Sequence, residues 1–180
     1  VAGQPLKRLE CADKVVGKQI YGADVILPGM LNAAIRQCPV FGGTVASIDE
    51  TPIKSMPGVK KVVTLENKTV AVIADYWWQA KTAVEALNIT WDEGEHAGVT
   101  SASIAEFVAA GLEADTAFVG NQNGDAPAAL DTAARTVEAT YSYPYQHHAT
   151  MEPMNATARW TEDRCEVWCP TQNGESALAA

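Results

Sequence analysis

The stretch HHATMEP, residues 147–153, brings together side chains that bind metal ions or transfer protons. Adjacent side chains on an extended strand point to opposite faces, so His147 and His148 reach one ion only where the backbone turns between them. We therefore predict a surface or hydrogen-bonded histidine pair. A zinc site that combines one of these histidines with Glu152 is the alternative.

Glu152 also has the chemistry of a general base, because a carboxylate in an apolar pocket can take up a proton near neutral pH. Pro153 follows it, which favours extended backbone and marks the end of a strand. Two methionines lie close by, at Met151 and Met154, and no partner acid is near in the sequence. We predict that this carboxylate accepts backbone N–H groups at a corner, with catalysis as the alternative.

Gln172 differs from these residues in its placement. Pro170 ends a strand-like run, and a helical pattern begins near Asn173. Gln172 should therefore lie at a strand-to-helix junction, where ligands often meet a sheet. Its amide offers two hydrogen-bond donors and one acceptor.

Four cysteines are scattered along the chain, at Cys11, Cys38, Cys165 and Cys169. On one strand, the last two would have Cα atoms about 13 Å apart at ~3.3 Å per residue, which is too far for a disulfide. We predict buried free thiols. The sequence has no G-x-G-x-x-G, Walker loop, C-x-x-C or nucleophile elbow, so it holds no self-sufficient catalytic motif.

The composition is that of a globular protein of 180 residues, with 47% hydrophobic and 19% charged residues. The net charge of −9 disfavours nucleic acid and anionic lipid as partners. No apolar run approaches the roughly 20 residues of a membrane helix. Val1 is not an initiator methionine and the last residues read as a starting helix, so we expect a piece of a longer protein.

The first half of the chain alternates strands and helices. VKKVVTL (59–65) and TVAVIAD (69–75) are rich in β-branched residues, and the second should be covered on both faces. A helix should follow, with Asp75 as its N-cap and an apolar face at helical spacing. That face is formed by Trp77, Ala80, Val84 and Leu87. NITW (88–91) returns to strand character.

A second helix is predicted by Ser103 and Glu106, which are spaced as in a capping box. Its apolar side is formed by Ile104, Phe107, Val108 and Leu112. The small polar residues after it indicate a linker, and residues 93–124 are the best candidate for a domain boundary.

The second half changes period. Asp125 and Pro127 begin a short helix that should turn Leu130 inward together with Ala133 and Ala134. Apolar and polar residues alternate from Val137 to Tyr145, which predicts a half-buried strand. A hairpin follows over 155–160 and 165–169.

Five separated segments, in order, resemble the large subunit of the molybdenum hydroxylases, the xanthine dehydrogenase and aldehyde oxidase family. MEPMNATA and EVWCPTQ are most similar to the branch that contains the isoquinoline 1-oxidoreductase beta subunits. The five segments are KVVGKQIYGADVILPGML, PVFGGTVASIDETPIKSMPGVKKVV, VAVIADYWWQAKTAVEALNITWDEG, VEATYSYPYQHHATMEPMNATA and CEVWCPTQ.

The resemblance implies an α+β fold, with an α/β hammerhead domain followed by the first strands of a molybdopterin-binding domain. The expected domains are an irregular segment at 1–14, the hammerhead at 15–95, a helix and linker at 96–124, and the start of the cofactor domain at 125–180. These boundaries agree with the change of period described above.

One functional residue follows from the resemblance. The family's glutamine of the (P/S)-T-Q motif hydrogen-bonds an oxygen ligand of the molybdenum, and here that motif is Pro170-Thr171-Gln172. A preorganised amide suits such an oxygen. The family's glycine-rich loop and its glutamate base are expected beyond Ala180, so neither catalytic nor metal-ligating residues are expected in this chain, and Glu152 does not match that base.

The resemblance implies an oxidoreductase that hydroxylates N-heterocycles or oxidises aldehydes with water as the oxygen source. It implies a molybdopterin cofactor, in the cytosine dinucleotide form, and an iron–sulfur small subunit as a partner besides the small-molecule substrate. The 180-residue chain alone should be inactive, without bound cofactor, and prone to self-association through uncovered strand faces. The compartment stays open between bacterial envelope and cytoplasm.

The rival interpretation is a non-catalytic module. In it, exposed sheet edges and the Trp-rich helix dock a partner subunit, and no molybdenum is bound.

Overall fold

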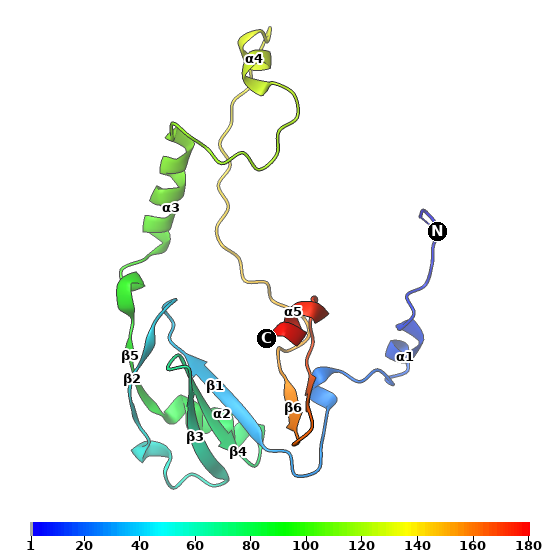
Figure 1. The fold of residues 1–180 in the computed structure, drawn as a ribbon, viewed down its shortest axis with the longest axis vertical. Helices are drawn as coiled ribbons and strands as arrows, with labels where there is room; N and C mark the ends of the chain where they lie inside the picture. Colours follow the sequence, from blue (N-terminus) through cyan, green and yellow to red (C-terminus); the bar gives the residue numbers. More distant parts are fainter. Residues whose placement is uncertain (1) are drawn as a thin grey trace. The chain divides into compact units, whose positions relative to one another are not determined.

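The computed structural model describes residues 2–180 and shows a mixed helix and sheet protein with two compact units (Figure 1). One unit is Met30–Thr140, and the other joins residues 2–29 to Tyr141–Ala180. Within residues 2–180, no helix is both long and apolar enough to cross a membrane.

The Met30–Thr140 unit contains two antiparallel sheets. One has the strand order β1-β4-β3 and the other pairs β2 with β5. The structure confirms the strands predicted over 59–65, 69–75 and 88–91. The strands are β1 (Asn32–Gln37), β2 (Thr44–Asp49), β3 (Val59–Leu65), β4 (Thr69–Ala74) and β5 (Asn88–Asp92).

Strand β4 is the centre of the three-stranded sheet, as its continuous apolar run predicts. Val70 and Val72 are fully buried. Val72 pairs with Ala34 on one side and Val62 on the other, so β-branched and small side chains stack across the sheet. β4 therefore holds β1 and β3 together as one sheet.

Helix α2 (Trp77–Ala86) packs on this sheet through small side chains. Ala80 and Ala83 are fully buried, and Val84 and Leu87 join them in the core. The predicted inward place of Trp77 is wrong, because this residue is 56% exposed. Two alanines on the buried face bring the helix close to the sheet, and this leaves no room there for an indole ring.

The predicted N-cap of α2 is also wrong by one residue. Tyr76 precedes the helix, and its N–H donates to Gln79 Oε1 at 3.0 Å. Asp75 instead forms an ion pair with Lys60 at 2.9 Å across the sheet. At the other end of the helix, Arg36 Nη1 on β1 donates to Val84 O and Leu87 O at 3.2 and 3.3 Å.

Two further helices in this unit confirm the predicted elements. Helix α3 (Ser101–Ala110) is capped by Thr100 and Ser103, so the predicted pair of Ser103 and Glu106 is wrong by three residues. Helix α4 (Ala126–Asp131) is capped by Asp125, as predicted, whose Oδ1 accepts the Ala128 N–H at 3.1 Å.

The apolar faces predicted for these two helices are exposed. Phe107 on α3 is 82% exposed and Leu130 on α4 is 62% exposed. Helical periodicity identifies which face is apolar, but burial needs a second element, and residues 2–180 supply none for these faces.

The second unit is built around an antiparallel hairpin of β6 (Thr157–Trp160) and β7 (Cys165–Trp168), which confirms the hairpin prediction. Helix α5 (Gly174–Ala179) follows it. The prediction of an irregular segment at 1–14 is wrong at its end, where α1 (Cys11–Val15) begins. Short 3₁₀ helices occupy Gly22–Asp24 (η1), Thr51–Ile53 (η2), Gly94–His96 (η3) and Gly111–Glu113 (η4).

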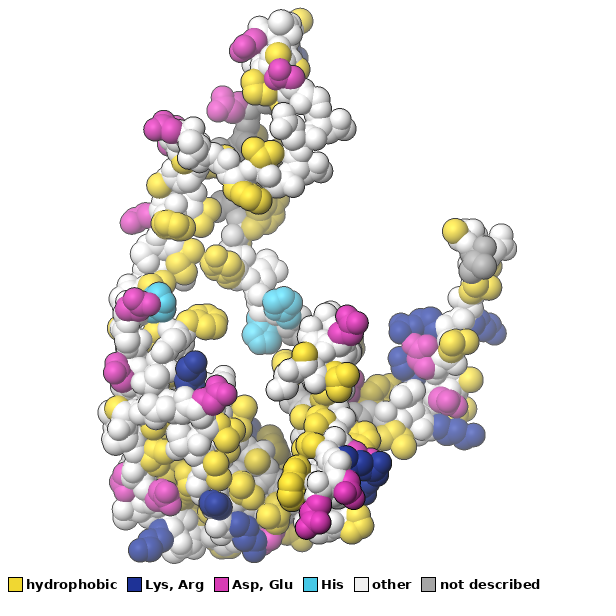
Figure 2. Space-filling view, viewed as in Figure 1, with side chains coloured by type: hydrophobic (Ala, Val, Ile, Leu, Met, Phe, Trp, Pro, Cys, Tyr) yellow, Lys and Arg dark blue, Asp and Glu magenta, His cyan; other side chains and the backbone are white. Residues whose placement is uncertain are grey.

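The strand predicted from Val137 to Tyr145 is wrong for this structure. The segment has no strand partner among residues 2–180, and its three tyrosines are between 77% and 86% exposed. These are Tyr141, Tyr143 and Tyr145. The alternation favours a half-buried strand, but a strand exists only where a neighbour completes its hydrogen bonds. Hydrophobic side chains accordingly reach the surface over much of the chain (Figure 2).

Candidate cofactor-binding site

The histidine pair lies at a corner of the backbone. Ala149 has a φ of 48°, and its N–H donates to His147 Nδ1 at 2.8 Å. His147 and His148 are both exposed. This matches the predicted surface, hydrogen-bonded pair. Within residues 2–180, no three His, Cys, Asp or Glu side chains are grouped to hold a metal ion.

The Glu152 carboxylate has the structural role that the sequence predicts. Its Oε1 accepts the backbone N–H of Gly22 at 3.1 Å, across 130 residues of sequence. The contact is partly buried. Glu152 therefore ties the corner to the N-terminal segment of the same unit.

Pro170, Thr171 and Gln172 form the strand-to-helix junction predicted for them, between the end of β7 and the start of α5. The Thr171 hydroxyl is committed to closing this turn, because Thr171 Oγ1 accepts the Asn173 N–H at 3.0 Å and donates to Asn173 O at 3.1 Å. Asn173 in turn caps α5, with Oδ1 accepting the Ser176 N–H at 3.0 Å.

Gln172 is exposed at this junction, and its amide takes part in none of the hydrogen bonds that the structure records for residues 2–180. Two donors and one acceptor are therefore open to a ligand. Since Thr171 and Asn173 fix the backbone on both sides, the amide can be offered without reorganising the turn. This donor fits an electronegative ligand atom, as the resemblance requires of residue 172.

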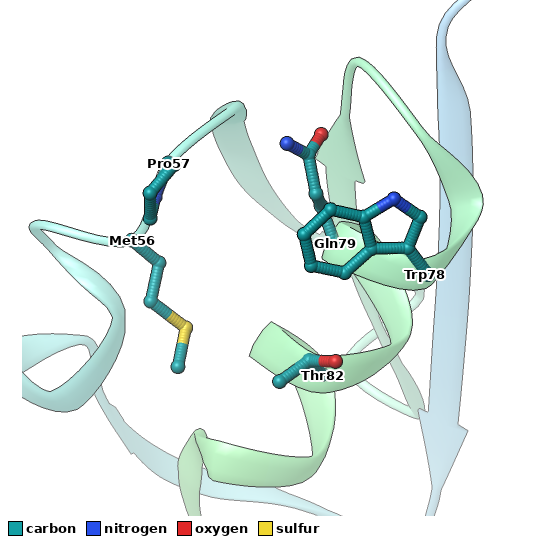
Figure 3. A pocket seen from close by; sticks show the side chains of 5 residues that line it. All are labelled: Met56, Pro57, Trp78, Gln79 and Thr82. Atoms are coloured by element: carbon teal, nitrogen blue, oxygen red, sulfur yellow. The ribbon is translucent and has the colours of Figure 1, made fainter.

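Two hollows of the structure lie in the Met30–Thr140 unit. In Figure 3, Met56 and Pro57, from the loop before β3, face three side chains of α2 across one of them; its volume is about 100 Å³. The α2 residues are Trp78, Gln79 and Thr82. A second hollow of about 310 Å³ is formed by the loop after β1, from Gln37 to Gly43, with Lys68. Gln172 lines neither of them.

The predicted free thiols are confirmed, but their predicted burial is wrong. All four cysteines are free; Cys11 and Cys165 are exposed, and Cys38 and Cys169 are partly exposed. The two on the β7 side lie in a two-stranded hairpin that has no second layer within its unit to bury them.

Gly22 and Asn155 were missed by the sequence reasoning, although both lie beside the junction. A Cβ atom built on Gly22 would be 2.7 Å from Asn155 Oδ1 and 3.0 Å from Pro170 Cδ. The only local signal was a glycine beginning a turn, which does not identify a neighbour more than 100 residues away.

Comparison with protein families finds one match, in the second part of the chain. Residues 111–179 match the family described as the molybdopterin cofactor-binding domain. This match includes the Pro170-Thr171-Gln172 junction.

Three curated relatives are each 26% identical to the chain. A nicotinate dehydrogenase subunit of Pseudomonas putida is matched over 96% of this chain and 15% of the relative. The beta subunit of isoquinoline 1-oxidoreductase from Brevundimonas diminuta is matched over 94% and 23%, respectively. A membrane-bound aldehyde dehydrogenase of Gluconacetobacter polyoxogenes, whose name gives pyrroloquinoline quinone as its cofactor, is matched over 88% and 22%.

Among solved structures, quinoline 2-oxidoreductase from Pseudomonas putida 86 aligns with 93% of this chain and 26% of its own, with a TM-score of 0.63 and 20% sequence identity. At that identity the likeness shows the fold alone, and it supports the mixed helix and sheet arrangement. The chain spans about a quarter or less of the length of these relatives. Residues 111–179 thus match the molybdopterin cofactor-binding domain family, and the chain is similar to subunits of nicotinate dehydrogenase and isoquinoline 1-oxidoreductase over part of their length.

Proposed function

We propose that this chain supplies an α/β hammerhead domain and the beginning of the molybdopterin-binding domain of a molybdenum hydroxylase. The hammerhead would comprise residues 15–95, the helix and linker 96–124, and the cofactor domain residues from 125 onward. The two-sheet unit with α2 supports the first part. The family match over residues 111–179 supports the second.

The observation that carries this proposal is the free amide of Gln172 at a rigid junction. Thr171 and Asn173 use their side chains to fix the turn, whereas Gln172 leaves its donors to a ligand. In the complete protein this amide donates a hydrogen bond to an electronegative atom of the bound cofactor and orients it. A fixed donor stabilises charge without the cost of reorganising solvent.

The cofactor, when bound, supplies the oxidation chemistry, and water is the oxygen source for hydroxylating an N-heterocycle or oxidising an aldehyde. The names of the relatives support substrates of this kind, since they include nicotinate, isoquinoline and aldehyde. We further propose the cytosine dinucleotide form of molybdopterin and an iron–sulfur subunit as the electron acceptor. The chain alone is inactive, because it offers one amide and no base or metal ligand at the junction.

The test replaces Gln172 with Ala in the complete protein. If the amide orients the cofactor, turnover falls roughly ten- to a hundredfold, the range found when a side chain that supports a metal centre is lost. Molybdenum content and thermal stability stay near those of the wild type, because the side chain is exposed and makes no internal contact. Gln122→Ala, a change of the same side chain in the exposed stretch before α4, serves as the control. Wild-type kinetics for Gln172→Ala would reject the assignment.

A docking module without cofactor is the second candidate, and the exposed aromatic residues of α2 favour it. Trp77 and Trp78 are 56% and 62% exposed, and such rings are frequent in subunit interfaces. Metal analysis separates the two candidates. A docking module would be purified with its partner and without molybdenum, whereas the enzyme would hold molybdenum in stoichiometric amount.

A further inference from the structure

In the turn η1, the backbone N–H of Gly22 has no acceptor within the turn. Short helices leave their first N–H groups without internal partners. Asp24 Oδ2 accepts the Tyr21 N–H at 2.9 Å, and the Asp24 N–H donates to Tyr21 O at 3.0 Å. The next donor, the N–H of Gly22, is taken by Glu152 Oε1 at 3.1 Å. A charged acceptor makes this a comparatively strong hydrogen bond.

Residue 22 is a glycine because of the space around it. The nearest atoms to a Cβ at this position would be Asn155 Oδ1 at 2.7 Å and Pro170 Cδ at 3.0 Å. Neither neighbour can easily move, because Asn155 Nδ2 is itself held by Pro153 O at 2.7 Å and Pro170 is a rigid ring. Any larger residue at position 22 must push against one of them.

The register of the hairpin explains why these two neighbours meet. Thr157 pairs with Trp168, so Asn155 and Pro170 face each other just beyond the paired residues. The backbone of Gly22 packs on that open end of the hairpin. Pro170 directly precedes Thr171 and Gln172 in the chain, so a shift of its ring is passed directly to the junction.

We propose that Gly22, Glu152 and Asn155 form a latch that fixes the position of the Gln172 amide. The latch holds η1 against Pro170, and Pro170 sets the direction in which the Thr171 turn leaves the hairpin. These three residues are positioning residues, since they act through the junction without touching the cofactor. The inference rests on the proposed function of Gln172, and it assigns to the N-terminal segment a role in the cofactor half of the chain.

Thr171 and Asn173 fix the turn itself, but in the described part of this unit no buried core holds the hairpin end from which the turn leaves. All fully buried side chains of residues 2–180 lie between Ile53 and Leu87, in the other unit. The hairpin end is therefore fixed by a hydrogen bond and a close contact, not by a core. Removing a side chain that orients a metal site without binding the metal typically lowers metal affinity or activity about ten- to a hundredfold.

The experiment uses the complete protein and measures amide hydrogen exchange in the peptide that contains residues 169–174. Gly22→Ala should accelerate that exchange roughly tenfold, because the added methyl group displaces Asn155 or Pro170. Glu152→Ala should do the same without adding an atom. Glu152→Gln retains an acceptor oxygen and should be near the wild type. Gly98→Ala, where a new Cβ has no neighbour within 4 Å, is the control.

Two combinations distinguish positioning from a general loss of stability. Gly22→Ala with Asn155→Ala removes the nearer obstacle and should slow the exchange in residues 169–174 relative to Gly22→Ala alone, without reaching the wild-type rate. Gly22→Ala should lower turnover about tenfold in the wild type but less than twofold in Gln172→Ala, because both changes act through the same amide.

Unchanged exchange in both Gly22→Ala and Glu152→Ala, or full additivity with Gln172→Ala, would overturn the latch. The exchange rates can be measured whether or not molybdenum is present. A wild-type protein without molybdenum would therefore contradict the proposed function and leave the test of the latch unaffected.

Discussion

At the scale of single residues, side chains that bond to a distant backbone organise this chain more than its ion pairs do. Asn32 donates to Asp75 O at 2.9 Å, Arg36 reaches the end of α2, and Glu152 accepts from Gly22. Each joins segments at least 43 residues apart. The ion pairs include exposed pairs one helical turn apart, which contribute little in water.

Asp49 gives a pH-dependent prediction at this scale. Hydrogen bonds from Thr51, followed by one from Asn88, hold the pKa of Asp49 below its ordinary value. Because the folded pKa is depressed, the stabilising contribution is fully present above the pKa of the unfolded chain and is lost as pH falls through the folded value. An NMR titration of the carboxyl should show its midpoint rising in Asn88→Ala. Thr90→Ala, on the same strand, should leave the midpoint unchanged, and an unmoved midpoint in Asn88→Ala would contradict the assignment.

At the scale of elements, the parts that the sequence predicted correctly are those with local causes. The continuous apolar run of β4, the alternation in β6 and β7, and the Asp125 cap depend on near neighbours, and all are present. The junction that carries Gln172 was predictable for the same reason.

The features that the sequence did not predict have one of two causes. Some depend on residues far away in the chain, and others depend on a packing partner that residues 2–180 do not provide. The latch joins Gly22 to Glu152 across 130 residues, and no local pattern encodes that pairing. Alternation identified an apolar face at Tyr141, Tyr143 and Tyr145, but not the partner strand that such a face needs.

Arg36 tests how one element stabilises another. Its guanidinium donates to Val84 O and Leu87 O, the carbonyl groups at the negative end of the α2 dipole. Arg36→Met keeps the apolar stem but loses these bonds, so the free energy of unfolding should fall by about 1–2 kcal/mol. Urea denaturation followed by tryptophan fluorescence measures this. Arg135→Met, in the exposed stretch after α4, is the control, and equal stability of both variants would show that the contact contributes nothing.

At the scale of the whole molecule, the buried hydrophobic side chains of residues 2–180 are confined to the Met30–Thr140 unit. They all lie between Ile53 and Leu87, and most of them form one cluster around Val70, Val72 and Leu87. The exposed apolar faces of α3, α4 and the tyrosine segment therefore require cover from further sequence or other chains.

Self-association is the consequence for the 180-residue chain by itself. Uncovered apolar faces and unpaired extended segments pair with other copies, so light scattering at rising concentration should show dimers or larger assemblies. Replacing Tyr141, Tyr143 and Tyr145 with Ser should reduce the assembly. Replacing three exposed alanines of α3 with Ser is the control. A single monomeric species at high concentration would be contrary to this prediction.

We propose that the complete protein holds a molybdenum cofactor beside Gln172. Its molybdenum content can be measured on the folded, purified protein by mass spectrometry of the metal against polypeptide. We expect one molybdenum atom per polypeptide. A folded, active protein with no molybdenum, or one with pyrroloquinoline quinone in its place, would contradict it.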